Sequence, residues 1–521
     1  MWLRRFGARH RVPLLATLPF VPLYAVWALW LATGGGDLAA QEAWAGFAAR
    51  HPGSAYNLFW YGGTHTANYS LLSPFLMAWA GVRAVTVASG LAATWCAARL
   101  LERSGAARPL WPALLAAAAL WCDVASGRTT FALGVAFGLA GCLAVTGGRP
   151  RPARAAVLGV LATAASPVAG LFLVVAGAGH LLDRRPRTAA ALVLPPFAVV
   201  ALTTVFFPFE GEQPMPAGRI WPPALFGAAV LLLAPRHWRV LRWGAGAYAL
   251  GVVLTYLIPS PVGTNVERLA ELAAPAALLA AATAVRRSPL RCAVLVLVCA
   301  LSVNWVTRKT IDDLRVSTRV PAWAADTKGV VAALERLGAD RTRVEVVPAR
   351  DHREASGLAP YADSARGWNR QLDVVRGRLF YDGTFSAHTY RQWLAENAVG
   401  LVVLHDGRPD GPAEQEAALV RSAPAWLEPV WKDAHWRVFR VRGAVPLAEP
   451  PAVVVRSDDA QVVVRVDRPG PVTVRVAYSP WLWADHHGCL VRDGRWIRLD
   501  APAAGEYRIG SRYRLPWNRR C

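Results

Sequence analysis

Apolar residues are distributed unevenly along the 521-residue chain. They form long runs up to about residue 306, and beyond this point apolar and polar positions alternate as in a globular protein. A helix needs about 20 apolar residues to cross a hydrocarbon core of about 30 Å, and somewhat fewer in a bundle of many helices. The runs therefore predict about eleven membrane-spanning helices. We expect them near residues 12–33, 81–101, 110–122, 129–145, 153–165, 167–182, 189–207, 222–234, 243–258, 266–285 and 292–306.

Arginines cluster in every second loop between these runs. Cytoplasmic loops of membrane proteins are enriched in Lys and Arg. A cytoplasmic N-terminus places every cluster in the cytoplasm, and an odd number of spans then places the C-terminal third outside. The clustered residues are Arg103, Arg108, Arg149, Arg151, Arg154, Arg184, Arg185, Arg187, Arg236, Arg239, Arg242, Arg286, Arg287 and Arg291. The sequence predicts a multi-pass protein of the cell membrane with extracytoplasmic C-terminal domains.

Composition agrees with this interpretation. The chain is 54% hydrophobic and 18% charged, with a formal net charge of +22. So high a positive charge is also typical of proteins that bind nucleic acid. Because the arginines lie in short groups between apolar runs, we expect membrane lipids, and no nucleic acid, as their partners.

The part of the chain after the last run divides into two patterns. Residues 311–445 alternate between helix-like and strand-like segments, and residues 450–521 contain short alternating strands separated by turns. The proline-rich segment Val445–Pro451 is the expected linker. We predict a polytopic α-helical membrane protein whose transmembrane domain, residues 1–310, contains an external loop at 34–80. An extracytoplasmic α/β domain and a small C-terminal β-sandwich follow it.

Two of the seven cysteines lie in this external region. Cys489 precedes a turn-like segment, and Cys521 ends the chain. Disulfides persist outside the cytoplasm, so we expect these two residues to pair. The other five cysteines lie in or beside apolar runs and are interpreted as small hydrophobic residues.

The external loop is far too long for a simple connector. It begins with GGGDLAAQEAW, Gly34–Trp44, in which Asp37 and Gln41 are spaced to share one face of a helix, with Glu42 adjoining. We expect an amphipathic helix lying along the membrane surface. The simplest explanation of Asp37 is a helix N-cap, because Asp after glycine is a preferred capping residue.

The acidic residue after the first span, the long loop, the number of spans and the external C-terminal domains together resemble the GT-C superfamily of membrane glycosyltransferases. This superfamily includes actinobacterial arabinofuranosyltransferases that use polyprenyl-phosphate sugars. Asp37 matches the acidic position, and NYSLLSPF, Asn68–Phe75, resembles the Tyr-containing end of such a loop.

The resemblance implies an inverting glycosyltransferase that moves a sugar from a polyprenyl-phosphate donor to an extracytoplasmic cell-envelope glycan, lipid or protein. Asp37 is then the catalytic base. A divalent metal stays an open alternative, although the loop has no Asp-x-Asp or Glu-x-Asp pair to support it, and no other cofactor is assigned.

A leaving phosphate needs cationic partners, and the fork of Arg binds phosphate oxygens in pairs. The few external arginines are therefore candidates, although each would equally reach lipid headgroups. The segment from Ala365 to Gly383 gathers polar and aromatic residues suited to an acceptor, and an ordinary solvated helix explains it equally well. The predicted substrate-binding residues are Gln41, Glu42, Arg128, Arg219, Asn265, Arg268, Trp368 and Arg370.

Two other functions remain open from the sequence. A transporter or lipid flippase would show charges at mid-membrane and internal symmetry, whereas the spans carry almost no such charge and no halves match. A non-catalytic scaffold for envelope assembly would carry the same layout without the chemistry.

Overall fold

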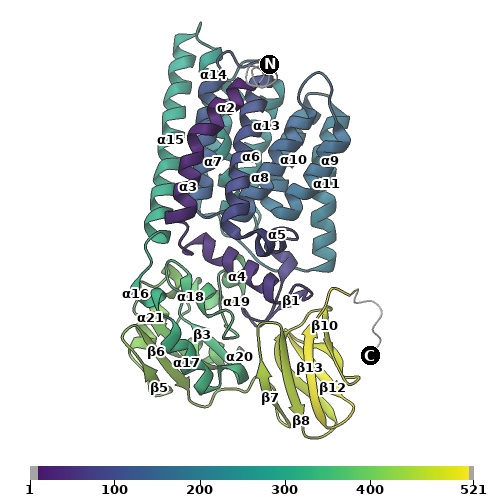
Figure 1. The fold of residues 1–521 in the computed structure, drawn as a ribbon, viewed down its shortest axis with the longest axis vertical. Helices are drawn as coiled ribbons and strands as arrows, with labels where there is room; N and C mark the ends of the chain where they lie inside the picture. Colours follow the sequence, from purple (N-terminus) through teal and green to yellow (C-terminus); the bar gives the residue numbers. More distant parts are fainter. Residues whose placement is uncertain (1–9, 515–521) are drawn as a thin grey trace. The chain divides into compact units, whose positions relative to one another are not determined.

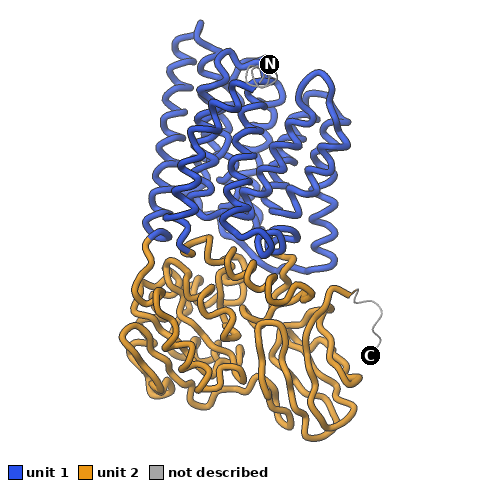
Figure 2. Tube along the Cα trace, in the orientation of Figure 1, with its two compact units in different colours: residues 1–33, 70–318 blue, residues 34–69, 319–521 orange. Residues whose placement is uncertain are grey.

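The structure is a computed structural model that describes residues 10–514. The chain forms two compact units (Figure 2). Unit 1 comprises residues 1–33 and 70–318, and unit 2 comprises residues 34–69 and 319–521. The first part of the predicted external loop therefore belongs with the C-terminal region. The domain boundaries expected from the sequence stay predictions.

Unit 1 is made of helices (Figure 1). Each of the eleven apolar runs coincides with a helix, and the first run is a helix whose winding changes between α, 3-10 and π turns up to Leu31. In chain order the helices are α2 (Arg11–Thr17), α3 (Val21–Val26), α5 (Ser73–Ala80), α6 (Val82–Arg103), α7 (Leu110–Ala125), α8 (Thr129–Val145), α9 (Pro152–Ala165), α10 (Pro167–Leu182), α11 (Pro186–Phe206), α12 (Trp221–Leu233), α13 (Arg239–Leu257), α14 (Glu267–Ala284) and α15 (Pro289–Ser317).

Within residues 10–514, five of these helices are long and apolar enough to cross a membrane, which indicates a membrane protein. They are Arg11–Leu31, Val82–Arg103, Pro186–Phe206, Arg239–Leu257 and Pro289–Ser317. Five further apolar helices have 10–17 residues. The count of about eleven spans is not confirmed, and the orientation stays a prediction.

Small residues allow the helices of unit 1 to pack closely, as membrane helices do. A Cβ atom at Gly90 of α6 would lie 2.4 Å from the ring of Tyr24 in α3. One at Gly179 of α10 would lie 2.5 Å from the carbonyl oxygen of Val240 in α13. Larger side chains at these two positions would push the helices apart.

Unit 2 contains a mixed four-stranded sheet in the order β3-β4-β6-β5. Strand β4 is buried along its whole length and pairs parallel to β3 and antiparallel to β6. The strands are β3 (Arg343–Val346), β4 (Val399–His405), β5 (Leu427–Lys432) and β6 (Trp436–Val441). The main helices are α17 (Lys328–Leu337), α18 (Arg353–Leu358), α19 (Arg370–Arg376), α20 (Ala387–Glu396) and α21 (Glu414–Arg421). Residues 319–445 thus have an α/β arrangement.

Two antiparallel sheets follow, in the orders β10-β13-β8-β7 and β11-β12-β9. They enclose a common core that includes Val462, Val474, Leu499 and Ile509. The strands are β7 (Ala452–Ser457), β8 (Gln461–Val466), β9 (Gly470–Ala477), β10 (Leu482–Ala484), β11 (Cys489–Asp493), β12 (Trp496–Ala501) and β13 (Gly505–Ser511). These sheets form a β-sandwich. Cys489 is disulfide-bonded, whereas its expected partner Cys521 lies outside the described residues, so that pairing stays a prediction.

Residues 34–69 contribute to this unit the helix α4 (Asp37–Arg50) and a short hairpin of β1 (Tyr56–Asn57) and β2 (Thr64–His65). Tyr56 belongs to the sandwich core, and its hydroxyl donates a hydrogen bond to the carbonyl oxygen of Ala477 at 2.9 Å. Nine of the 14 residues of α4 are buried. The expectation of an amphipathic helix is therefore wrong, because buried residues lie on most sides of α4. Its expected place along the membrane surface stays a prediction.

Candidate functional site

The glycines before α4 fix where Asp37 begins its helix. Gly36 has a φ of +64° and a ψ of −140°, a conformation that is essentially restricted to glycine. It is the N-cap of α4, so Asp37 is the first helical residue. The N-cap interpretation of Asp37 is therefore wrong.

Both backbone groups of Gly36 are held by residues of the α/β part of unit 2. Its N–H donates to the carbonyl oxygen of Asp351 at 2.7 Å. Its carbonyl oxygen accepts a hydrogen bond from Trp368 Nε1 at 3.0 Å. The Trp368 indole stacks on His352, with ring centroids 3.5 Å apart and planes inclined by 13°. The residue immediately before Asp37 is thus tethered on two sides.

Burial sets the ionisation of the groups around this tether. It lowers the pKa of His352 well below 6.5, and the cation of Arg370 lowers it further, so the imidazole is neutral. Burial raises the pKa of Asp351, although Arg353, at 3.2 Å, partly opposes the shift. Burial and the neighbouring Asp351 raise the pKa of Glu354 well above its usual range. Burial thus disfavours the charged forms of His352, Asp351 and Glu354 next to Gly36.

Trp368 and Arg370 belong to one polar network. Arg370 pairs with Asp410 at 2.7 Å, donates to the Tyr381 hydroxyl at 2.9 Å and lies over the Trp368 ring at 5.1 Å. The Tyr381 hydroxyl donates in turn to Asp373 at 2.5 Å. The alternative of an ordinary solvated helix does not describe this segment, because its side chains are bound to one another.

Behind this network lies Arg366, a fully buried cation. It donates two hydrogen bonds to Asp373, at 2.9 and 2.7 Å, and one to Glu416 at 2.8 Å. Burial opposes ionisation of Asp373, but the Arg366 guanidinium outweighs it and lowers the pKa of that carboxyl. The ion pair fixes the start of α19 against α21.

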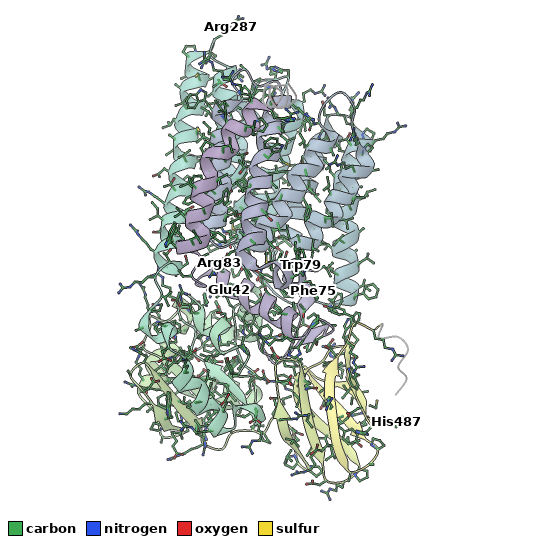
Figure 3. The ribbon with its side chains drawn as sticks, viewed as in Figure 1. Glu42, Phe75, Trp79, Arg83, Arg287 and His487 are labelled. Carbon is green, nitrogen blue, oxygen red and sulfur yellow. The ribbon has the colours of Figure 1, made fainter. Side chains whose placement is uncertain are left out.

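Gln41 and Glu42, both on α4, have different surroundings. Gln41 is buried, and its amide donates to the hydroxyl of Tyr69, whose ring stacks on Trp44 at 5.7 Å. Glu42 is half-buried, and its Oε2 lies 2.7 Å from where a Cβ at Gly34 would stand (Figure 3 labels Glu42). Of these two residues, Glu42 is half-buried, as Asp37 is, whereas Gln41 is buried.

The predicted cations of unit 1 lie in a second cluster. Arg128 pairs with Glu271 and lies 3.5 Å from Asp123. The Lys309 ammonium donates hydrogen bonds to both Glu271 and Glu267, the latter at 2.6 Å. This network links α7, the start of α8, α14 and α15.

Glu267 also holds Arg219, whose guanidinium binds it through two hydrogen bonds of 2.7 Å. Arg268 lies over the ring of Phe131 at 5.3 Å, and Asn265 lies in a 3-10 turn before α14. Arg128 and Arg219 are therefore engaged by carboxylates, and a phosphate would have to compete with these carboxylates for them.

A polar cavity of about 10 Å³ lies within the cluster, lined by Asp123, Arg128, Glu271 and Lys309 among others. That volume accommodates about one water molecule. Ionisable groups buried among membrane helices are costly and are usually paired and functional. The cluster is thus a second candidate site.

The structure brings the predicted residues together in two separate sets. Unit 2 unites Asp37, Gln41, Glu42, Trp368 and Arg370, and unit 1 holds Arg128, Arg219, Asn265 and Arg268. Sequence reasoning missed Glu267, Glu271, Lys309, Asp351 and His352 as site residues. The i, i+4 pair Glu267 and Glu271 inside a predicted span was a detectable signal, whereas nothing local marked His352.

The fold and the site define a protein of the membrane type with one helical unit and a second unit of mixed α and β structure. Residues 449–521 match a family described as a domain of unknown function, DUF8823. No curated protein matches the chain. Among solved structures, the chain is similar to a variant of the arabinofuranosyltransferase AftD from Mycobacteria, determined by cryo-electron microscopy, at 16% sequence identity and a TM-score of 0.44. The similarity covers 87% of this chain and 43% of that chain. The chain thus spans less than half the length of that structure, and neither match assigns the whole chain to a family.

Proposed function

We propose that this protein is an inverting membrane glycosyltransferase of the GT-C kind, with a polyprenyl-phosphate sugar as donor and an extracytoplasmic cell-envelope acceptor. One observation carries the proposal. Asp37 opens α4 directly after Gly36, whose N–H and carbonyl oxygen are both held by the α/β residues Asp351 and Trp368. A carboxylate that is half-buried and follows a tethered backbone is suited to act as a general base.

In the proposed reaction Asp37 takes the proton of an acceptor hydroxyl as that oxygen attacks the anomeric carbon. The bond between that carbon and the phosphate oxygen breaks in the same step, so the configuration inverts. The leaving polyprenyl phosphate needs a cation, and Arg268 with Asn265 stays the sequence-based candidate for this role. Glu42, half-buried on α4, is the assigned partner of acceptor hydroxyls, whereas Gln41, Trp368 and Arg370 position the site around them.

The precise position of the base strongly affects the rate of the chemical step. Correctly oriented groups contribute up to about 7–11 kcal/mol of barrier reduction, and misplacement by about 1 Å can cost about 100-fold. The two hydrogen bonds to the backbone of Gly36 hold the backbone of the adjacent Asp37 in a fixed position. A helix cap would not require it.

The test is Asp37→Asn, assayed for transfer from polyprenyl-phosphate pentoses and hexoses in proteoliposomes. Asn keeps the shape of the side chain and removes its basicity, so turnover should fall by about 10²–10⁴-fold with unchanged folding. Asp326→Asn, the same change at an exposed position before α17, is the matched control and should retain activity. Near-normal turnover of the Asp37→Asn variant would refute the assignment.

A transporter or lipid flippase remains the second candidate because of the buried ion pairs of unit 1. Glu271 and Lys309 lie on helices with apolar sequences, which is the setting of many transport sites. Glu271→Gln separates the two functions. Loss of lipid or solute translocation in the same proteoliposomes, with no sugar transfer detected for the unaltered protein, would favour the transporter.

A further inference from the structure

Unit 2 contains an open pocket that the proposed reaction does not use. Its volume is about 540 Å³, within the range of about 300–1,000 Å³ typical of small-molecule sites. The residues that follow α4 form one side, and strands β8, β10 and β13 of the sandwich form the other. The lining side chains that bear on its chemistry are His51, Gln461, Trp483, Arg508, Arg512 and Tyr513.

The strand register explains why the pocket is hollow. Gly510 of β13 pairs with Trp483 of β10 on one side and with Gln461 of β8 on the other. Gly510 also lines the pocket and has no side chain to fill the space between these two. The indole of Trp483 and the amide of Gln461 therefore stand on either side of a bare backbone.

The lining combines aromatic faces with hydrogen-bond donors. The guanidinium of Arg512 lies 4.9 Å from the centre of the Trp483 ring, and Tyr513 is 44% exposed. Arg508 is exposed beside them and offers up to five N–H donors, and Gln461 offers both donor and acceptor. Aromatic rings with a few placed polar groups are what a sugar requires, because one face of a sugar ring is lined with C–H groups and its edge with hydroxyls.

A metal ion is a poorer occupant. His51, Asp458 and Asp459 beside the pocket have ligand atoms within 4.8 Å of one another. However, the Arg50 guanidinium donates to Asp459 at 2.6 Å, and His51 Nε2 lies 2.6 Å from the same carboxylate. Both sites of Asp459 are thus occupied, and the charge of Arg50 opposes a cation. Among the described residues that line the pocket itself, none is a carboxylate.

We propose that this pocket is a non-catalytic glycan-binding site that holds an oligosaccharide against Trp483 and Tyr513. The sugar rings stack on the two aromatic side chains, and Gln461, Arg508 and Arg512 bind the hydroxyls. The assignment of this glycan as the acceptor rests on the proposed function, whereas the binding itself does not. His487, at the outer edge of the sandwich (Figure 3), is not among the lining residues.

The binding is tested with the purified full-length protein in detergent, on immobilised linear oligosaccharides of pentoses and of hexoses. The best probe is then titrated by calorimetry. Trp483→Ala and Arg508→Ala should each weaken binding by about tenfold or more. Arg508 is exposed, so its variant keeps the proposal testable if Trp483→Ala fails to fold. Arg498→Ala, an exposed arginine of β12 in the other sheet, is the matched control and should bind normally.

No binding to any of these oligosaccharides would overturn the proposal, as would equal binding by the unaltered protein and both variants. Binding to anionic lipid vesicles that is lost in the variants, with none to the glycans, would replace it with a membrane-contacting role. The Asp37→Asn variant should bind glycan as the unaltered protein does. If the unaltered protein binds no glycan but its transfer activity depends on Asp37, the pocket proposal alone is refuted. If it binds glycan through the pocket but transfers no sugar, only the proposed reaction is refuted.

Discussion

The indole N–H of Trp368 donates a hydrogen bond to the carbonyl oxygen of Gly36, a residue 332 positions earlier in the chain. Gly36 immediately precedes Asp37, the carboxylate that follows the first apolar helix. The backbone position of this carboxylate therefore depends on a residue of the C-terminal α/β region. Changes in that region should affect the start of α4.

We expect Trp368→Phe to loosen the start of α4. Phe keeps an aromatic face for His352 but cannot donate to Gly36, and the loss of one such hydrogen bond costs about 0.5–1.5 kcal/mol. Amide hydrogen exchange at residues 36–40 should become faster, and transfer activity should fall by about 10- to 100-fold. Trp393→Phe removes a similar 3.0 Å bond to the carbonyl of Arg376 and should leave exchange at residues 36–40 unchanged. Equal exchange in the two variants would contradict the tether.

Gly36→Ala should also destabilise the start of α4, because it strains the backbone of that residue. The φ of +64° with a ψ of −140° is strained for any residue with a Cβ, at a cost of about 1–3 kcal/mol. We expect a lower unfolding temperature and faster proteolysis near residue 36. Gly411→Ala is the control, because a Cβ at Gly411 meets nothing within 4 Å. An unchanged unfolding temperature in the Gly36→Ala variant would show that the backbone can relax there.

The helices of unit 1 could be predicted from the sequence because a hydrophobic run is a local signal. The eleven runs coincide with helices for this reason, although within residues 10–514 length and hydropathy support a membrane crossing for five of them. The character of α4 was predicted incorrectly. Its alternation of alanines with Asp37 and Glu42 resembles a surface helix, whereas its surroundings come from distant parts of the chain.

Individual residues of the candidate site could be predicted from local signals, but their partners could not. Asp37 stands out in the sequence by its place after an apolar run. The candidate arginines of unit 1 stand out because arginine is rare in the loops predicted to be external. Their partners were not predictable, because Asp351 and His352 are brought to Gly36 only by the fold. Glu271, which engages Arg128, and Glu267, which engages Arg219, lie about 140 and 50 residues away in the chain. A local sequence pattern cannot predict ion pairs between residues so far apart in the chain.

Arg366→Met should destabilise unit 2 strongly. The guanidinium is buried, with 1% of the side chain exposed, and it neutralises Asp373 and Glu416. Removing one partner of a buried ion pair leaves uncompensated charge and costs about 3–5 kcal/mol. Denaturant unfolding followed by tryptophan fluorescence should show this loss. Arg378→Met, at a side chain that is 84% exposed, should change the midpoint little, and an equally small shift for Arg366→Met would refute the role of the pair.

His405 should make the stability of unit 2 depend on pH. Burial lowers its pKa from 6.5 to about 4, and its Nε2 donates to the carbonyl oxygen of Val347 at 3.0 Å. Above pH 6.5 neither state is protonated, so the stability is complete. As the pH falls from 6.5 toward 4, the unfolded chain takes up a proton that the folded chain does not, and stability is lost.

The loss attributable to His405 should reach about 2 kcal/mol at pH 5, since one pKa unit corresponds to about 1.36 kcal/mol. Unfolding at a series of pH values measures it. His405→Gln should reduce the pH dependence, whereas His388→Gln, at an exposed position of α20, should not. An identical pH profile for His405→Gln and the unaltered protein would contradict the prediction.

The membership of residues 34–69 in unit 2 has a consequence for how the protein is made. The Ser511 hydroxyl accepts a hydrogen bond from the backbone N–H of Tyr56, 455 residues earlier. At about 5–20 residues per second, roughly 20–90 seconds separate the synthesis of these two residues. During this interval the aromatic segment around Tyr56 has left the ribosome, and the strands that will cover it do not yet exist. Truncation by a premature stop codon would make that exposure permanent, so cells must shield or degrade a nascent chain of this kind.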